Sequence, residues 1–327
     1  MRKAALLYNP ASGSKRDRRL AHVEDAAAVL RAAGVDVLVV PTRAAGTAGE
    51  QAREAVAAGC DTILACGGDG TVHEILPGVA SSSAALGVIP LGTGNGLAND
   101  LGTSHHTVKA ARQLLAAEIR RIALGRVDFQ NGEGRPAQRY FTVGAGAGGD
   151  ARMLYEVGHQ AKGRHGMLAY YLNVAWQLAT YPLSPFEVEY RESGSGERRV
   201  VEVSQALAIR IRDFGGIVRK VAPDAGLERD DFQLLLVRTA RRRAFLRYMV
   251  QTFLDRPRRV RGVEMVHATE ASFREMPPDD PRRAAWPQRP ACAIYTEADG
   301  EVLGRLPLRL SMVPAALNLL YPAHPKR

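Results

Sequence analysis

The stretch from residue 62 to residue 79, an apolar strand joined to a helix by a glycine-rich turn, most constrains how this chain can fold. Thr62 to Cys66 form a short apolar run with a β-branched centre, which is typical of a buried strand in a parallel sheet. Glycines let the backbone approach a ligand closely, and the N-terminus of the following helix offers free N–H groups and a partial positive charge. Such a turn suits a phosphate group, although a simple turn capped by Asp or Thr is the alternative for one motif alone. The turn consists of Gly67, Gly68, Asp69, Gly70 and Thr71.

A second glycine-rich loop follows the next predicted strand. Leu86 to Pro90 are apolar, and residues 91–100, Leu-Gly-Thr-Gly-Asn-Gly-Leu-Ala-Asn-Asp, open another helix. Two neighbouring parallel strands that end in such loops line one crevice at the carboxyl edge of the sheet, where ligands of open α/β sheets bind. The pair of loops therefore favours a phosphate-binding crevice over two unrelated turns.

The order of the patterns divides the chain into two domains. Up to residue 101, predicted strands alternate with predicted helices, which indicates an α/β domain with a parallel, helix-covered sheet. Beyond it, strand-like segments follow one another without regular helical crossovers, which predicts a mostly antiparallel β-sandwich domain. We place the first domain at residues 1–127 and the second at 128–313. Helices are expected at about 150–180 and 240–254. The strand-like segments of the second part are 121–129, 139–143, 185–191, 199–211, 232–237, 292–297 and 306–313.

Charge and cysteine usage narrow the class of protein. A net charge of +10 fits either a basic soluble surface or a polyanionic partner such as a nucleotide, a nucleic acid or an anionic membrane. The 3 cysteines form no Cys-x-x-Cys pair, which argues against a disulfide framework or a zinc site and favours a reducing compartment. No apolar run reaches the roughly 18 residues of a spanning helix. The basic, amphipathic pattern at 240–254 fits a solvent-facing helix as well as a membrane-facing one.

Three motifs together resemble the catalytic domain of the diacylglycerol kinase family. They are Tyr-Asn-Pro-Ala-Ser-Gly at 8–13, Gly-Gly-Asp-Gly-Thr at 67–71 and Gly-Thr-Gly-Asn at 92–95. That family includes bacterial lipid kinases and sphingosine kinases, and NAD kinases are distant relatives. The resemblance continues in order to Asp-Gly-Glu at 299–301 and to the tail at 313–317, and it implies that residues 314–327 return to the first domain.

The resemblance implies ATP and Mg²⁺ as cofactors and assigns the residues that would act on them. Glu301 would be the general base, because a carboxylate within hydrogen-bond reach of a hydroxyl can accept its proton. In sphingosine-type relatives the Asp of the glycine-rich loop has that role, so Asp69 is the competing candidate. Asp299-Gly300 also favours a hairpin turn, which is compatible with either role. The implied nucleotide contacts are Asn9, Ser12, Gly13, Thr42, Gly67, Gly68, Asp69, Gly70, Thr71, Val72, His73 and Thr93.

Residues 222–232 resemble a family segment that carries a turn with a structural magnesium ion. The resemblance implies Asp230 and the carbonyls of Leu227 and Phe232 as its ligands. The family's glycine is replaced here by Asp231, so an acidic β-turn without a metal is equally expected. The spacing Gly-x-Gly-x-x-Gly at 144–149 does not predict a dinucleotide fold, because no acidic residue ends a second parallel strand some 20 positions later.

These observations predict an ATP-dependent lipid kinase whose acceptor is diacylglycerol or a related lipid. The alternatives are a sphingosine- or ceramide-type kinase, then an NAD kinase-like enzyme, then an inactive nucleotide or lipid sensor. The absence of a Walker sequence Gly-x-x-x-x-Gly-Lys-Ser/Thr excludes a P-loop ATPase. We expect a cytoplasmic protein at the inner face of the membrane that binds a lipid substrate, has no nucleic-acid partner and forms either a monomer or a homodimer.

Overall fold

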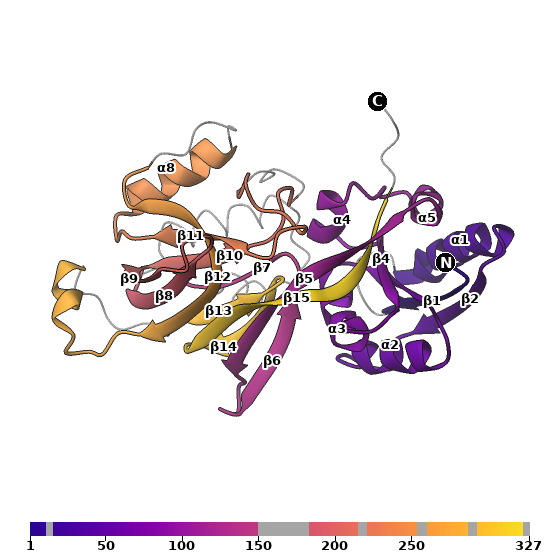
Figure 1. The fold of residues 1–327 in the computed structure, drawn as a ribbon, viewed down its shortest axis with the longest axis horizontal. Coiled ribbons are helices and arrows are strands. Elements are labelled where there is room, and N and C mark those ends of the chain that lie inside the picture. Colours follow the sequence, from indigo (N-terminus) through magenta and orange to yellow (C-terminus); the bar gives the residue numbers. More distant parts are fainter. Residues whose placement is uncertain (11–15, 150–182, 215–220, 254–259, 287–292, 323–327) are drawn as a thin grey trace.

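The computed structural model describes residues 1–10, 16–149, 183–214, 221–253, 260–286 and 293–322 of the chain. Two lobes lie side by side, and two long strands, β5 (Glu118–Gln130) and β15 (Leu308–Tyr321), run between them (Figure 1). The two strands pair antiparallel along almost their whole length, with one irregularity between Val313 and Leu317. The helix expected at about 150–180 lies outside the described residues.

The N-terminal lobe is built on a parallel sheet, as the sequence predicts. Every residue of β3 and β4 is buried, because helices cover both faces of the sheet. β15 extends the sheet by pairing parallel to β4 at Asn318 and Leu319. The strands are β1 (Lys3–Tyr8), β2 (Asp36–Pro41), β3 (Thr62–Gly67) and β4 (Ala85–Pro90), in the spatial order β4-β3-β1-β2.

Alternate side chains of the central strands enter two separate cores. Leu6 packs with α1 (Arg16–Ala32) and α5 (Thr107–Leu115) on one face, whereas Leu7 packs with α2 (Ala48–Ala57) and α3 (Asp69–Val79) on the other. This division follows from the two-residue period of a strand. The chain leaves β1 toward one face and β3 toward the opposite face, although the two strands are neighbours. Their carboxyl ends therefore form a topological switch point, which is where open α/β sheets bind ligands.

The second lobe is mostly antiparallel, which confirms the predicted fold class. Its core gathers side chains from the inner faces of the strands, including Phe141, Phe186 and Phe273. The segment predicted as one strand at 199–211 is two strands, divided at Ser204. Its elements are β6 (Pro136–Phe141), β7 (Gly144–Ala147), β8 (Phe186–Glu192), β9 (Arg198–Val203), β10 (Gln205–Ile209), β11 (Phe232–Val237), α8 (Arg242–Phe253), β12 (Val263–Glu275), the 3-10 helix Pro281–Ala285, β13 (Tyr295–Ala298) and β14 (Glu301–Arg305).

Two further findings bear on the sequence-based expectations. Cys60 and Cys66 are both buried with free thiols. Among the described residues, none of the helices combines the length and the apolar character that crossing a membrane requires.

Candidate active site

The two glycine-rich loops contact each other backbone to backbone. A Cβ atom added to Gly92 would lie 2.5 Å from the Cα of Gly68, a distance that only glycine permits. Asn95, with φ 55°, locks the second loop by accepting a hydrogen bond from Gly92 N at 3.0 Å and donating one to Gly92 O at 2.8 Å. The predicted pair of loops is thus brought together at one edge of the sheet.

Asp69 belongs to the first of these loops, is the first residue of α3 and faces the second loop. Its Oδ1 accepts a hydrogen bond from Leu97 N at 3.4 Å, at the start of α4 (Gly96–Asp100). Its Oδ2 would lie 3.1 Å from a Cβ atom added to Gly94. Burial is the largest influence on Asp69 and raises its pKa; the negative charge of Asp299 acts in the same direction, while backbone N–H groups of 95–97 oppose both.

Asp299 fixes the hairpin turn of the second lobe that lies next to the glycine-rich loop. It is buried, and its carboxylate accepts hydrogen bonds from the backbone N–H groups of Thr142, Val143 and Gly144 at 2.9, 2.8 and 3.0 Å. Asp299 and Gly300, with φ 48° and 83°, form the expected tight turn between β13 and β14. The carboxylate therefore fixes this hairpin against the start of β7, a role that the sequence did not indicate.

Glu301, the first residue of β14, reaches from the second lobe to the glycine-rich loop of the first. Its Oε1 lies 3.2 Å from the position of a Cβ atom on Gly70. The side chain is exposed, in contrast to Asp299 two residues earlier. Both candidates for the general base, Asp69 and Glu301, consequently lie at the same glycine-rich loop.

The remaining expected nucleotide contacts within the described residues follow the carboxyl ends of strands or lie in α3. Asn9, Thr42 and Thr93 follow the ends of β1, β2 and β4, and Thr42 N donates to Tyr8 O at 2.8 Å. Ser12 and Gly13 lie outside the described residues. The side chains of Val72 and His73 are buried.

His73 is turned toward Asp299. Its Nδ1 lies 3.6 Å from Asp299 Oδ2, and its Nε2 lies 3.3 Å from Arg139 Nη1. The buried imidazole therefore lies between the carboxylate of Asp299 and the guanidinium of Arg139.

Comparisons with known proteins show which family this chain belongs to. A family described as the diacylglycerol kinase catalytic domain matches residues 3–127, and the YegS C-terminal NAD kinase beta sandwich-like domain matches residues 143–321. A diacylglycerol kinase of Bacillus subtilis is 32% identical over 250 residues, which cover 76% of this chain and 77% of that protein. The chain belongs to the diacylglycerol kinase family. It is a lipid kinase.

Further relatives of this lipid kinase extend the match over nearly the whole chain. A diacylglycerol kinase of Mycobacterium tuberculosis is 28% identical over 323 residues, 98% of this chain and 96% of that protein. The crystal structure of a diacylglycerol kinase from Bacillus anthracis, 18% identical, covers 98% of this chain and 96% of that one with a TM-score of 0.64, and it shows the same fold.

The turn at 227–232 of this lipid kinase is organised by a buried arginine, Arg210. Its side chain is fully buried just beyond the end of β10. Nη2 donates to the carbonyl oxygens of Leu227 at 3.0 Å and Ala123 at 2.8 Å, and Nη1 donates to those of Arg229 and Asp231, both at 3.1 Å. One sequence signal could have revealed it, namely a charged residue inside the apolar run Ala-Leu-Ala-Ile-Arg-Ile.

The expected structural magnesium does not fit this turn. The Leu227 carbonyl already faces a guanidinium, and the side chain of Asp230 is exposed. Asp231, which stands where the family has glycine, is buried and bonded to Arg229 at 2.6 and 2.7 Å and to His267 at 3.2 Å. In the part of the chain that the structure describes, no group of three His, Cys, Asp or Glu residues could hold a metal. The guanidinium of Arg210 thus already binds the Leu227 carbonyl that a metal ion at this turn would need.

Proposed function

We propose that this lipid kinase transfers the γ-phosphoryl group of ATP to the hydroxyl of diacylglycerol. The observation that carries the proposal is the approach of Glu301, on the second lobe, to Gly70 in the glycine-rich loop of the first. A nucleotide at this loop and a lipid hydroxyl at Glu301 would meet in one crevice. The acceptor is inferred from the relatives in Bacillus subtilis and Mycobacterium tuberculosis, both diacylglycerol kinases.

The first lobe would hold the phosphates. Backbone N–H groups of the loop at 67–71 and the N-terminus of α3 would face the phosphate oxygens. The carboxylate of Asp69, an oxygen donor at the mouth of this loop, has the chemistry to hold the Mg²⁺ that neutralises phosphate charge during transfer. This role suits Asp69 better than that of base, because its oxygens already accept hydrogen bonds from the start of α4.

Glu301 would then act on the acceptor. As the lipid oxygen attacks, its proton passes to the Glu301 carboxylate and a bond forms between that oxygen and the γ-phosphorus. The bond from the γ-phosphorus to the bridging oxygen breaks, and ADP leaves with the electron pair. Asp299 would hold the turn that carries Glu301 in place, because its carboxylate accepts hydrogen bonds from backbone N–H groups of the second lobe.

The lipid acceptor requires work at a membrane surface, and α8 offers a basic face for it. Arg243 and Arg247 are exposed one turn apart, and Val250, 48% exposed, follows them on the same face. Tyr248 and Ala244 pack against the second lobe instead. We infer peripheral attachment through this face to the anionic inner surface of the membrane.

A transfer assay with labelled γ-phosphate tests the proposal. Diacylglycerol, monoacylglycerol, sphingosine and ceramide would be offered in mixed micelles, with NAD as a soluble acceptor. We expect label in diacylglycerol and a fall in kcat on the order of 10²-fold or more in Glu301→Gln. Glu133→Gln, an exposed carboxylate on the β5–β6 turn, is the matched control and should retain full activity. Label confined to another lipid or to NAD would overturn the assigned acceptor, and full activity of Glu301→Gln would overturn the assigned base.

A further inference from the structure

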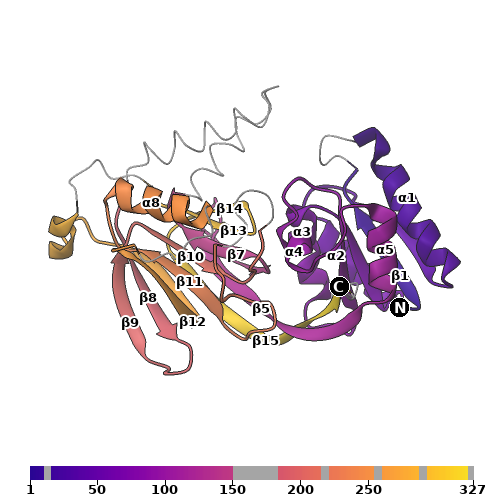
Figure 2. The ribbon, with the colours of Figure 1, turned by 90° about the horizontal axis from the view of Figure 1, so that it is seen from above.

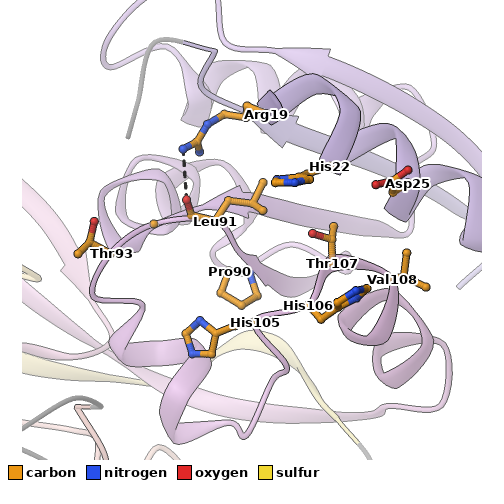
Figure 3. A pocket seen from close by; sticks show the side chains of 11 residues that line it. Arg19, His22, Asp25, Pro90, Leu91, Thr93, His105, His106, Thr107 and Val108 are labelled. Carbon is orange, nitrogen blue, oxygen red and sulfur yellow. Dashed lines mark hydrogen bonds between the residues drawn. The ribbon is translucent and has the colours of Figure 1, made fainter. Parts of the chain in front are cut away.

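A cavity lies beside the loop that follows β4, between α1 and the start of α5 (Figure 3). Its volume is about 400 Å³, within the range of small-ligand sites. Gly92 and Thr93 line it, but none of residues 67–71 does. The cavity therefore adjoins the loop that packs against Gly68, while the glycine-rich loop that carries Asp69 forms none of its wall.

Arg19, which lines this cavity, has a guanidinium with unmet hydrogen-bonding capacity. Its side chain is 4% exposed, and its Nη2 donates to Leu91 O at 3.2 Å (Figure 3). Its Nε and Nη1 are buried without a hydrogen-bond partner. Burial also lowers the pKa of Arg19. A buried cation with free N–H groups is costly unless an acceptor reaches it, so this side chain points to an anionic ligand.

The opposite wall is a helix N-terminus without a cap. The N-cap residue of α5, His106, makes no side-chain cap hydrogen bond, and the first turn contains no acidic residue. The free N–H groups and the positive end of the helix dipole favour an anion there.

Hydroxyl and imidazole groups complete the lining of the cavity. Thr107, the first residue of α5, provides a hydroxyl group. His22 and His105 provide imidazole rings that lie across from each other in Figure 3. Asp25, exposed on the next turn of α1, is the one carboxylate among the described residues that line the cavity. Arg19, His22 and Asp25 are spaced by three residues and so share one face of α1.

We propose that this cavity is an accessory site for a phosphate group, separate from the site of phosphoryl transfer. A phosphate would supply acceptors to the Nε and Nη1 groups of Arg19 and to the N–H groups at the start of α5. Because Gly92 and Thr93 belong to its wall, an occupant would stabilise the loop that packs against Gly68. The site thus offers a means of adjusting the catalytic loop by a free phosphate or by the phosphate of a lipid headgroup.

Calorimetric titration of the full chain with inorganic phosphate tests the site. We expect binding that persists in the presence of a saturating non-hydrolysable ATP analogue. Arg19→Met should weaken it at least about tenfold, whereas Arg18→Met, the exposed neighbour of equal charge, should change it by less than about twofold. If Arg19→Met does not fold, the double variant His22→Gln/His105→Gln replaces it, with an expected weakening of at least about threefold.

The proposal is overturned if the wild-type chain does not bind phosphate, if the ATP analogue displaces it, or if the cavity variants bind it as tightly as the wild type. Flotation with phosphatidylglycerol vesicles then identifies the source. Weaker flotation of the cavity variant than of Arg18→Met assigns the site to a lipid headgroup, and equal flotation assigns it to free phosphate.

Discussion

At the scale of single residues, the ionised carboxylate of Asp69 is needed for the proposed chemistry but destabilises the folded protein. Burial raises its pKa, so the folded protein binds this proton more tightly than the unfolded chain does. Its favourable contribution to folding is complete below the unfolded pKa of about 4 and is lost as the pH rises through the folded pKa. At pH 7 the ionised carboxylate is therefore destabilising, which is typical of groups retained for function.

We predict that Asp69→Asn raises the free energy of unfolding at pH 7 and lowers kinase activity on the order of 10²-fold or more. The amide retains an oxygen that can accept the hydrogen bond from Leu97 N, so the fold should persist. Denaturant unfolding at pH 7 and at pH 3 measures the effect. The gain in stability should shrink at pH 3, and a variant less stable than the wild type at pH 7 would contradict the argument.

Arg210 is the residue on which the turn at 227–232 depends. Its guanidinium donates to four backbone carbonyls from two distant segments, and burial lowers its pKa to about 10, which still leaves it charged at neutral pH. Arg210→Met should cost at least about 3 kcal/mol, because it leaves buried carbonyls without donors. Arg198→Met, an exposed arginine on β9, should change stability by less than about 0.5 kcal/mol.

Thermal unfolding also distinguishes a turn held by the guanidinium of Arg210 from a turn held by a metal ion. Because the guanidinium takes the place of a cation, EDTA should leave the Tm of the nucleotide-free protein unchanged. A drop in Tm with EDTA that added Mg²⁺ restores would show that a structural metal is bound after all.

At the scale of elements, the crossing of α2 and α3 depends on two glycines. A Cβ atom on Gly78 would lie 2.1 Å from Gly49 O and 2.8 Å from the Cβ of Ala52, so the helices would have to separate. Gly78→Ala should therefore destabilise the fold by about 1–3 kcal/mol. Gly132→Ala, where a Cβ meets nothing within 4 Å, is the control and should be near neutral. Denaturant midpoints measure both, and equal midpoints would refute the close crossing.

Some strands of the structure could be predicted from the sequence and others could not. The parallel sheet was predictable because β1, β3 and β4 are continuous apolar runs between glycine-rich turns. β12 was not predicted, since most of its side chains are only partly buried and its apolar residues do not keep one alternating phase along the strand. β7, Gly-Ala-Gly-Ala, was hidden because its glycines suggest a loop. They are needed where a Cβ on Gly146 would lie 2.2 Å from Ala206 O.

The candidate site was predictable to the extent that its chemistry is local in sequence. Asp69 lies within a contiguous motif and Glu301 within another, and the structure places both at one crevice. The roles of Asp299 and Arg210 depend on partners far away in the chain, such as Val143 and Ala123. Only the folded structure brings those groups together.

At the scale of the whole molecule, the proposed attachment to a membrane depends on which face of the protein presents its positive charge, which is +10 in net. α8 lies on the outer surface of the second lobe, on the opposite side of that lobe from β8 and β9 (Figures 1 and 2). Two arginines near an anionic surface contribute about 2 kcal/mol, or a roughly thirtyfold change in partitioning.

We therefore predict that Arg243→Gln/Arg247→Gln binds phosphatidylglycerol vesicles about thirtyfold more weakly than the wild type at low salt. The pair Arg198→Gln/Arg199→Gln removes the same charge from β9 and should bind almost as tightly as the wild type. Raised salt should reduce the difference, because screening weakens attraction at the surface. Activity toward a soluble, short-chain acceptor should be unchanged in both pairs, since neither touches the crevice. Equal losses in the two pairs would mean that net charge, and not the face of α8, brings the enzyme to the membrane.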